Sequence, residues 1–224
     1  MKKIIISILL IMLSIIPTNA EIVTEHEIQT KIDQIGTNIL NCNKVQTHIV
    51  FTYNKKTRRN VYKMIHGIKK NQIIMYDGIY QYTETDDEIA AILSRQIYFI
   101  SKIYSKFDNR MNVAKNPRFY ERIIDKKAVD YMVNANYNPL ALITYLNKTY
   151  PEYKYSLRHN RTANRLVSIY EYILLKYPQY LKDDNPYLDN PYYQNFLLNT
   201  VFERGLLRVK LNRNDNENEE FENE

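Results

Sequence analysis

The stretch D-D-E-I-A-A-I-L-S-R-Q-I-Y-F-I-S-K-I, residues 86–103, decides the fold of this chain. It opens with three acidic residues, which are favourable in the first turn of a helix. Apolar residues then recur every three or four positions, at Ile89, Ile92, Leu93, Ile97, Ile100 and Ile103. This spacing predicts a long helix with one buried face.

Upstream of residue 86, the sequence predicts a supporting helix and a small sheet. A helix is expected over residues 25–40, with one apolar stripe made by Ile28, Ile32, Ile35 and Ile39. Residues 45–53 alternate in the manner of a strand, and the residues on one side are Val45, Thr47, Ile49 and Phe51. After a basic turn, two further short strands are expected at residues 61–65 and 72–76. We therefore expect an antiparallel sheet.

Downstream, the sequence predicts helices over residues 118–135, 139–149 and 162–176. Asn138 can cap the second of these, which Pro139 opens. The residues of the first helix that we expect to face inward are Ile123, Ala128, Tyr131, Met132 and Ala135. The fold class expected from all these elements is α+β, mostly helical.

Several segments resemble one family of zinc metallopeptidases, that of HtpX and the CAAX prenyl proteases. The family's active-site helix reads approximately D-E-L-A-A-V-L-G-H-E-I-A-H, and D-E-I-A-A-I-L at residues 87–93 is similar to it. I-I-M-Y-D-G-I-Y at residues 73–80 is similar to the family's I-F-V-Y-T-G-L-L, and N-Y-N-P at residues 136–139 to its G-Y-N-P. The resemblance covers about residues 25–177 and implies a zincin-like fold with a small antiparallel sheet flanking the former active-site helix. It also leads us to expect a tight or left-handed turn at Gly78.

The residues that carry the family's chemistry are replaced in this chain. Arg95 and Phe99 stand at the positions of the two zinc-binding histidines, and Gln96 stands at the position of the general base. A guanidinium stays protonated and a phenyl ring has no donor atom, so neither side chain binds zinc. A glutamine amide does not act as a base. We therefore expect no bound metal, no cofactor and no catalytic residue.

The family's third zinc ligand lies in the motif E-x-E-A-D, which aligns with residues 121–125. The ligand position holds Ile123, while the neighbouring aspartate is kept as Asp125. His159 and Arg165 match the family's H-P-x-x-x-x-R-I segment, which folds back near the metal. The resemblance thus implies one former active-site region made of Arg95, Asp125, His159 and Arg165. Two alternatives stay open for Arg95: it pairs with Asp125, or it reaches solvent and pairs with nothing.

The first twenty residues are typical of a secretory signal peptide. Lys2 and Lys3 precede an apolar run over residues 4–16, and small residues at Thr18 and Ala20 form a cleavage site. A transmembrane helix needs roughly 20 apolar residues, and this run is shorter. We therefore expect export to the periplasm or the exterior, and a mature chain from Glu21 without a membrane span.

The net charge bears on which kinds of binding partner we expect, and the cysteine content on how Cys42 is placed. The mature chain carries a net charge of about +4, and without the acidic residues 212–224 it carries about +9. No nucleic-acid motif accompanies this charge, and export also argues against a nucleic-acid partner. Cys42 is the single cysteine, and we expect it to be buried on the apolar face of the first helix.

These features predict a metallopeptidase-like domain over residues 21–178, a Tyr- and Pro-containing extension over residues 179–211, and an acidic disordered tail over residues 212–224. We expect an inactive relative of the peptidases that binds extended peptides or envelope proteins by strand addition. One alternative is an active peptidase with an altered site built from His159, Asp125 and Glu121. The other is a secreted interaction protein that works through its Tyr-rich extension. The oligomeric state does not follow from the sequence.

Overall fold

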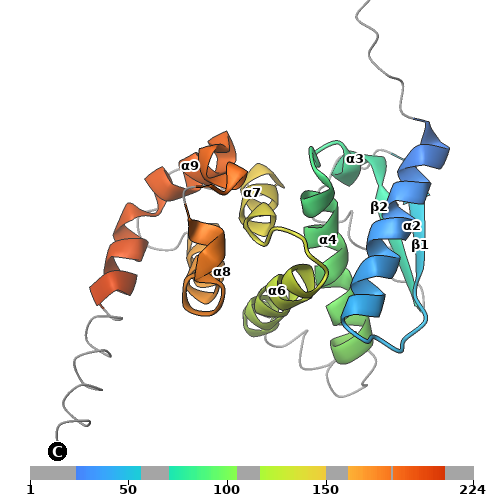
Figure 1. Ribbon diagram of the computed structural model, residues 1–224, viewed down its shortest axis with the longest axis horizontal. Coiled ribbons are helices and arrows are strands. Elements are labelled where there is room, and N and C mark those ends of the chain that lie inside the picture. Colours follow the sequence, from blue (N-terminus) through green and yellow to red (C-terminus); the bar gives the residue numbers. More distant parts are fainter. Residues whose placement is uncertain (1–23, 57–70, 105–116, 150–160, 183, 210–224) are drawn as a thin grey trace, which may run out of the picture.

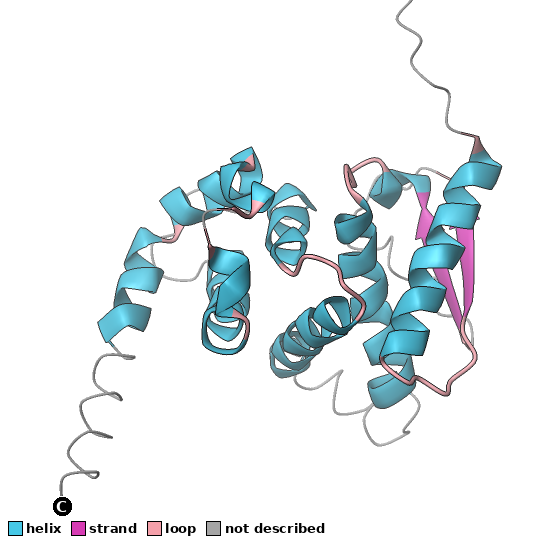
Figure 2. Cartoon of the chain, viewed as in Figure 1, coloured by secondary structure: helices cyan, strands magenta, loops and turns pink. Residues whose placement is uncertain are grey.

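The structure of the chain, a computed structural model, describes residues 24–56, 71–104, 117–149, 161–182 and 184–209. Helices make up 74% of these residues, beside one sheet of two short strands (Figures 1 and 2). The expected α+β class with mostly helix is therefore confirmed. Among these described helices, none is long and apolar enough to cross a membrane.

The elements follow one another in a simple order. The α-helices are α2 (Glu25–Cys42), α3 (Asp77–Tyr80), α4 (Asp86–Tyr98), α6 (Pro117–Asn134), α7 (Leu140–Thr149), α8 (Arg161–Lys176) and α9 (Pro191–Asn199). A π-helical turn, η2 (Phe99–Tyr104), continues α4, and two 3-10 turns, η3 (Pro178–Leu181) and η4 (Pro186–Asp189), precede α9. The strands are β1 (Val50–Asn54) and β2 (Gln72–Tyr76). A last helix spans residues 201–209.

Helix α4 lies at the centre of the molecule, between α2, α6 and α7 (Figure 1). All ten residues from Glu88 to Ile97 are buried, so the expectation of one buried face is wrong. Small side chains at Ala90, Ala91 and Ser94 let neighbouring helices approach on sides that a one-sided helix would leave to solvent. Glu88 and Arg95 can be buried in α4 because α7 and α6 supply ion-pair partners for them.

The helix ends are fixed by local hydrogen bonds that follow from the sequence. Thr24 forms a capping box with Glu27 at the start of α2, and the hydroxyl of Thr85 accepts the amide of Glu88 at the start of α4. Asn138 caps α7 as expected, because its side chain accepts the amide of Leu140 at 3.1 Å. The boundaries predicted for α2, α6, α7 and α8 are accordingly close to those observed.

The two strands pair in parallel, with Thr52 opposite Ile74, so the expectation of an antiparallel sheet is wrong. Antiparallel strands can be joined by a tight hairpin, whereas parallel strands need a long crossover. The 17 residues between β1 and β2, 55–71, supply that length. The ladder begins only at residue 50, although the alternating burial expected from residue 45 onward is present. The strand expected at residues 61–65 lies outside the described residues.

The backbone at Gly78 differs from the expectation. Gly78 lies inside the short helix α3, and none of the described glycines has a positive φ. The left-handed conformations occur instead at Lys44, Asn71 and Asn136. Asparagine tolerates this region better than most residues, because its short polar side chain can bond to the local backbone. The chain therefore enters α4 through a helical turn rather than a glycine-dependent one.

Cys42 is exposed, so the expectation that it is buried is also wrong. The buried stripe of α2 ends at Ile39, and Cys42 occupies the last turn of the helix beyond it. Its Sγ atom lies 3.4 Å from Oδ1 of Asn38. The stripe is buried only where the sheet and the neighbouring helices cover α2.

The C-terminal elements pack onto the rest of the protein through aromatic side chains. Tyr187, Tyr193 and Phe196 belong to the same buried core as α4, and α9 lies against α7 (Figure 1). The hydroxyl of Tyr187 lies 2.7 Å from that of Thr85 and donates to Asp87. Residues 184–199 are thus part of the folded core.

At Gly36, α2 packs closely on β1, because a Cβ atom there would overlap the buried ring of Phe51. Replacing Gly36 with Ala improves helix propensity by about 1 kcal/mol but forces the ring to move, at about 1–3 kcal/mol. We expect the G36A variant to lose up to about 2 kcal/mol in the free energy of unfolding, measured by urea denaturation.

The matched control is Gly205→Ala, in the helix over residues 201–209. A Cβ atom at Gly205 meets nothing within 4 Å. This variant should gain about 0.5–1 kcal/mol, since alanine is the better helix former. Equal stabilisation by both substitutions would contradict the close packing of α2 on Phe51.

Candidate functional site

The centre of the candidate site is the carboxylate of Asp125, which is held between two arginines from two other helices. Nε of Arg95 in α4 donates to Oδ1 at 2.7 Å. Arg165 in α8 donates from Nε to Oδ2 and from Nη2 to Oδ1, the second at 2.8 Å. Asp125 is 1% exposed and Arg95 is 8% exposed. These three side chains, one carboxylate and two guanidinium groups, join α4, α6 and α8. We call them the Asp125 cluster.

The electrostatics of this cluster favour the ionised carboxylate. Burial by itself raises the pKa of the Asp125 carboxyl, because a charged group loses solvation there. The positive charges of Arg165 and Arg95, with their hydrogen bonds, outweigh burial and lower the pKa below its usual value. Asp125 is thus a permanent anion at neutral pH.

The donor set of this region does not fit a zinc ion. Both oxygens of Asp125 already accept hydrogen bonds from guanidinium groups, and the protonated guanidinium of Arg95 offers no lone pair to a metal. No group of three or more His, Cys, Asp or Glu side chains that could hold a metal occurs in the part of the chain that the structure describes. The arrangement binds α4, α6 and α8 together.

The structure describes three of the four other residues predicted for this region. Gln96 is buried next to Arg95 in the sequence of α4, and Phe99 opens the π-helical turn at its end. Ile123 is half-buried, while the next residue along α6, Ile124, is buried. His159 lies outside the described residues. Of the two alternatives for Arg95, the pairing with Asp125 is the one observed.

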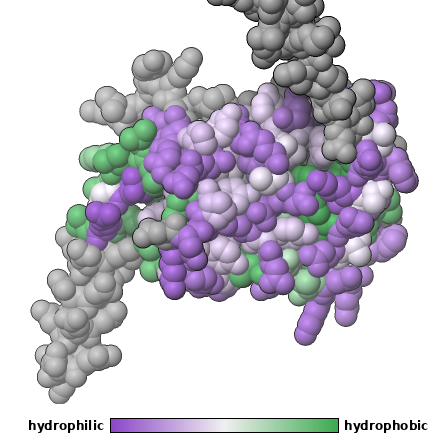
Figure 3. All heavy atoms as spheres, turned by 45° about the horizontal axis from the view of Figure 1, so that its top comes forward, coloured by the Kyte–Doolittle hydropathy of each residue, from purple (hydrophilic) through white to green (hydrophobic). Residues whose placement is uncertain are grey.

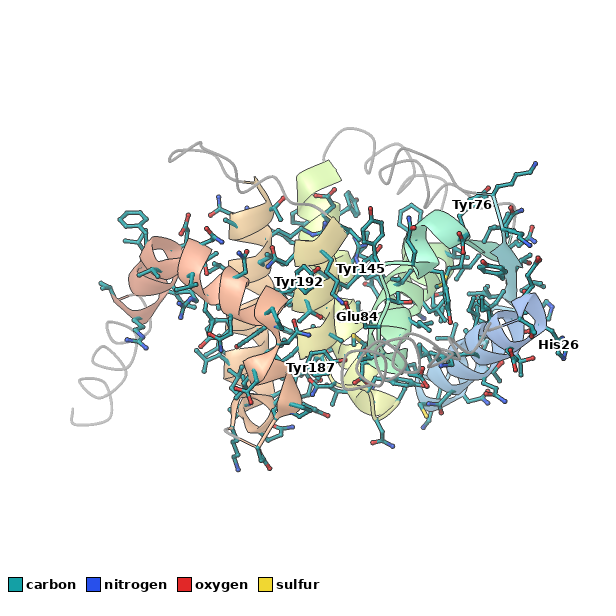
Figure 4. The ribbon with its side chains drawn as sticks, turned by 90° about the horizontal axis from the view of Figure 1, so that it is seen from above. His26, Tyr76, Glu84, Tyr145, Tyr187 and Tyr192 are labelled. Atoms are coloured by element: carbon teal, nitrogen blue, oxygen red, sulfur yellow. The ribbon has the colours of Figure 1, made fainter. Side chains whose placement is uncertain are left out.

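A second buried ion pair lies at the other end of α4. Nζ of Lys148, from α7, lies 2.8 Å from Oε1 of Glu88, and the hydroxyl of Thr144 donates to the same oxygen at 2.9 Å. Glu84 adds a second carboxylate 2.9 Å from Lys148, and the ring of Tyr192 lies over the ammonium group at 5.0 Å. Glu84 and Tyr192 are both labelled in Figure 4. The pair fixes α7 to α4.

A third cluster surrounds Asp130 on α6. Its carboxylate accepts hydrogen bonds from the hydroxyls of Tyr172 and Tyr177 and from the ammonium groups of Lys127 and Lys176. Burial raises the pKa of Asp130, but these donors outweigh it and lower the pKa. The cluster therefore fixes α8 and the chain that follows it against α6.

Sequence reasoning missed the Glu88 and Asp130 clusters, although a signal for both was present. Asp130 lies among inward-facing residues of α6, and Lys148 ends the mostly apolar stretch of α7. A charged residue on the apolar face of a helix is rarely buried without a partner. Its presence therefore predicts a buried ion pair, but not which residue supplies the other charge.

The sheet beside α4 has two different edges. On the outer edge of β1, the side-chain amide of Gln29 donates to the carbonyl of Phe51 at 3.1 Å and accepts the amide of Tyr53 at 2.6 Å. This is the bonding pattern of a neighbouring strand, so the β1 edge is already occupied.

The outer edge of β2 has no such cover within the described residues. The register pairs Thr52 with Ile74, so a parallel ladder directs the backbone groups of Ile73 and Met75 toward β1. The amide and carbonyl of Ile74 then point to the opposite side, where none of the described strands pairs with β2. This edge has the geometry that strand addition requires.

Comparison of the chain with protein-family models, with curated proteins and with solved structures found no match.

The Asp125 cluster leads to a prediction about stability. Replacing Asp125 with Ala leaves two guanidinium groups with no counter-charge at the cluster, and we expect a loss of about 3–5 kcal/mol in the free energy of unfolding. Arg95→Ala should cost less, because Arg165 still neutralises the carboxylate. Urea denaturation of the purified variants measures both losses.

A matched control is the exposed ion pair between Lys55 and Glu25, whose nitrogen and oxygen lie 2.7 Å apart. Glu25→Ala should change stability by less than about 1 kcal/mol, since solvent screens exposed pairs. If Asp125→Ala and Arg95→Ala were as mild as this control, the cluster would not hold the helices together.

The lowered pKa of Asp125 also predicts how stability depends on pH. The unfolded chain takes up a proton on this residue near pH 3.9, whereas the folded protein does so only at a lower pH. The contribution of the Asp125 carboxylate is therefore complete above about pH 5 and is lost as the pH falls through the folded pKa. We expect the melting temperature of the D125N variant to fall less steeply than that of the unaltered protein as the pH is lowered from 7 to 2. Thermal unfolding at a series of pH values measures this dependence.

Proposed function

We propose that this protein is an exported, non-hydrolytic relative of the HtpX and CAAX prenyl protease family that acts by binding extended peptides or envelope proteins. The resemblance of residues 87–93 and 136–139 to the family, and the signal-peptide pattern of residues 1–20, support this proposal. The proposal makes the former active-site helix a structural centre and assigns binding to the neighbouring sheet.

The proposed lack of hydrolytic activity rests mainly on the Asp125 cluster. Hydrolysis by a zinc peptidase needs three protein ligands, an open coordination position and a base beside the bound water. Here Arg95, Gln96 and Phe99 supply neither ligand nor base, and the oxygens of Asp125 are taken by arginines. One compensating substitution would not restore the site, because four positions differ at once.

The observation that supports peptide binding is the asymmetry of the sheet. Gln29 covers the outer edge of β1, whereas the backbone of Ile74 on the outer edge of β2 is directed away from the ladder. Strand addition derives its affinity from such backbone groups, with side-chain pockets adding selectivity. The β2 edge is therefore the binding edge in this proposal.

Measurements of metal content and of substrate cleavage test the proposal that the protein is non-hydrolytic. The purified mature protein, incubated with zinc and then dialysed, should contain far less than one zinc per chain by elemental analysis. It should also leave a fluorescently labelled unfolded casein intact. Stoichiometric zinc together with chelator-sensitive cleavage would overturn the proposal in favour of an altered peptidase.

A single substitution tests the binding edge. Proline at position 74 removes the outward amide of β2 without removing any ladder bond to β1. We expect I74P to weaken binding of the labelled casein at least tenfold in fluorescence anisotropy.

The control is Ile74→Val, which keeps the amide and the β-branched shape and should bind normally. Circular dichroism and the melting temperature report whether I74P keeps its fold. Undiminished binding by a folded I74P variant would exclude the β2 edge.

Fewer observations support the alternative in which the protein works through its Tyr-rich extension. Tyr187 and Tyr193 are buried in the core, where they hold the extension to α4 and α7 rather than forming a surface. What the extension does expose is the apolar side of its last helix.

A further inference from the structure

Arg95 is held in the Asp125 cluster by one edge of its guanidinium group. Its Nε atom donates to Oδ1 of Asp125 at 2.7 Å, whereas Arg165 bonds to both oxygens of the same carboxylate. The two amino groups of Arg95, Nη1 and Nη2, carry the remaining N–H donors. Within the described part of the chain, no acceptor bonds to either of them. Asp125 therefore satisfies Arg95 in part.

Burial makes these donors unusual. The side chain of Arg95 is only 9% exposed. A guanidinium group removed from water is costly unless its charge is paired and its donors find acceptors. Among the described carboxylates, Asp125 is the one that pairs with Arg95, and it pairs with Arg165 at the same time. The described surroundings of Arg95 thus supply no negatively charged acceptor at its amino groups.

The amino groups are nevertheless within reach from outside. Arg95 is 8% exposed, and neither of its amino groups is among the described side-chain atoms that are both sealed from solvent and without a hydrogen bond. The exposed part of this residue therefore includes Nη1 and Nη2. A small group can approach them without displacing Asp125, because that carboxylate bonds to a different edge of the guanidinium.

We propose that Nη1 and Nη2 of Arg95 form a binding site for the carboxylate of a ligand. The two amino groups of a guanidinium present parallel N–H donors in a fixed fork, which matches the two oxygens of a carboxylate. In this site, Asp125 positions the guanidinium of Arg95 through Nε, and the charge of Arg165 offsets that of Asp125.

A carboxylate fits this site better than a phosphate. It brings one negative charge, whereas a phosphate group at neutral pH brings up to two close to the Asp125 anion, and like charges at short range repel. A carboxylate is also small and planar, which suits the narrow exposure of Arg95. Phosphate is therefore included in the test as the competing anion.

The attraction at this site comes from charge and hydrogen bonding. Most of the exposed large apolar residues belong to residues 192–209, on the C-terminal helices, where Figure 3 shows hydrophobic side chains beside the tail drawn in grey. None of these residues belongs to the Asp125 cluster. We therefore expect the ligand to be selected by its anionic group.

The site is independent of the function proposed for the sheet. None of its three residues belongs to β1 or β2, so carboxylate binding at Arg95 and peptide binding at the β2 edge succeed or fail separately. A folded I74P variant should accordingly keep the Arg95 site.

The test is nuclear magnetic resonance of the mature protein labelled with ¹⁵N-arginine, at pH 7. Sodium acetate replaces sodium chloride in steps up to about 100 mM at constant ionic strength, because salt screens the attraction. We expect the side-chain N–H signal of Arg95, assigned by its absence from the R95K variant, to shift and saturate with a dissociation constant of about 1–10 mM. Acetamide has the same shape without the charge and should cause no such shift, and sodium phosphate should bind more weakly than acetate.

Substitutions at Arg95 test the guanidinium itself. Arg95→Lys keeps the positive charge but loses the planar fork, so we expect roughly tenfold weaker acetate binding, measured by saturation transfer from the protein to the methyl group of acetate. Arg95→Met removes the charge and should abolish binding. The matched control is Arg208→Lys, at an exposed arginine of the helix over residues 201–209, which should bind acetate as the unaltered protein does. Circular dichroism reports whether each variant is folded, and R95K decides the matter if R95M is not.

Two peptides identify the source of the carboxylate. Both are trialanine acetylated at the amino end, one with a free carboxylate at the other end and one with an amide. Binding of the free acid alone assigns the site to the end of a peptide chain, whereas binding of acetate without either peptide assigns it to a small acid. The proposal is overturned if acetate causes no saturable shift of Arg95, if acetamide causes the same shift, or if R95K binds acetate as tightly as R208K. Tighter binding of phosphate than of acetate would also overturn it.

Discussion

The structure depends on the carboxylate of Asp125 more than on any other single group. It is buried, it is ionised, and it is held by guanidinium groups from α4 and α8. An ion pair of this kind contributes little to stability relative to a well-packed apolar cluster, but it cannot lose a partner without a large penalty. It therefore acts as a constraint on geometry, because α4, α6 and α8 must meet with the right orientation for the charges to be satisfied.

The same principle governs the rest of α4. A helix that is buried on every side normally carries few charged residues, yet this one carries Glu88 and Arg95 in its buried part. Each finds its partner on a different neighbouring helix, Lys148 on α7 and Asp125 on α6. The central helix is thus fixed at both ends by charge, and its apolar and small residues pack between those points. In the proposed function, this framework replaces the metal centre of the related peptidases and keeps the adjacent sheet in position.

The two ends of the molecule offer different surfaces. At the sheet, the side chain of Gln29 occupies one edge and leaves the backbone of Ile74 directed outward at the other. At the C-terminal helices, exposed apolar residues lie on both sides of Gly205 in the sequence, on a helix that the other described residues leave partly uncovered. The first surface suits an extended peptide, because it presents backbone donors and acceptors.

The sequence by itself determined the helices, because apolar spacing and capping residues such as Thr85 and Asn138 act over a few positions. Through the resemblance of their segments to one family, it named a pairing of Arg95 with Asp125 as one of two open alternatives, and the structure decided between them. Only the tertiary structure decided the parallel pairing of β1 and β2, the exposure of Cys42 and the burial of α4 on all sides. These properties depend on which distant elements come to lie against a segment, and neither strand direction nor helix coverage is encoded in the periodicity of the segment itself.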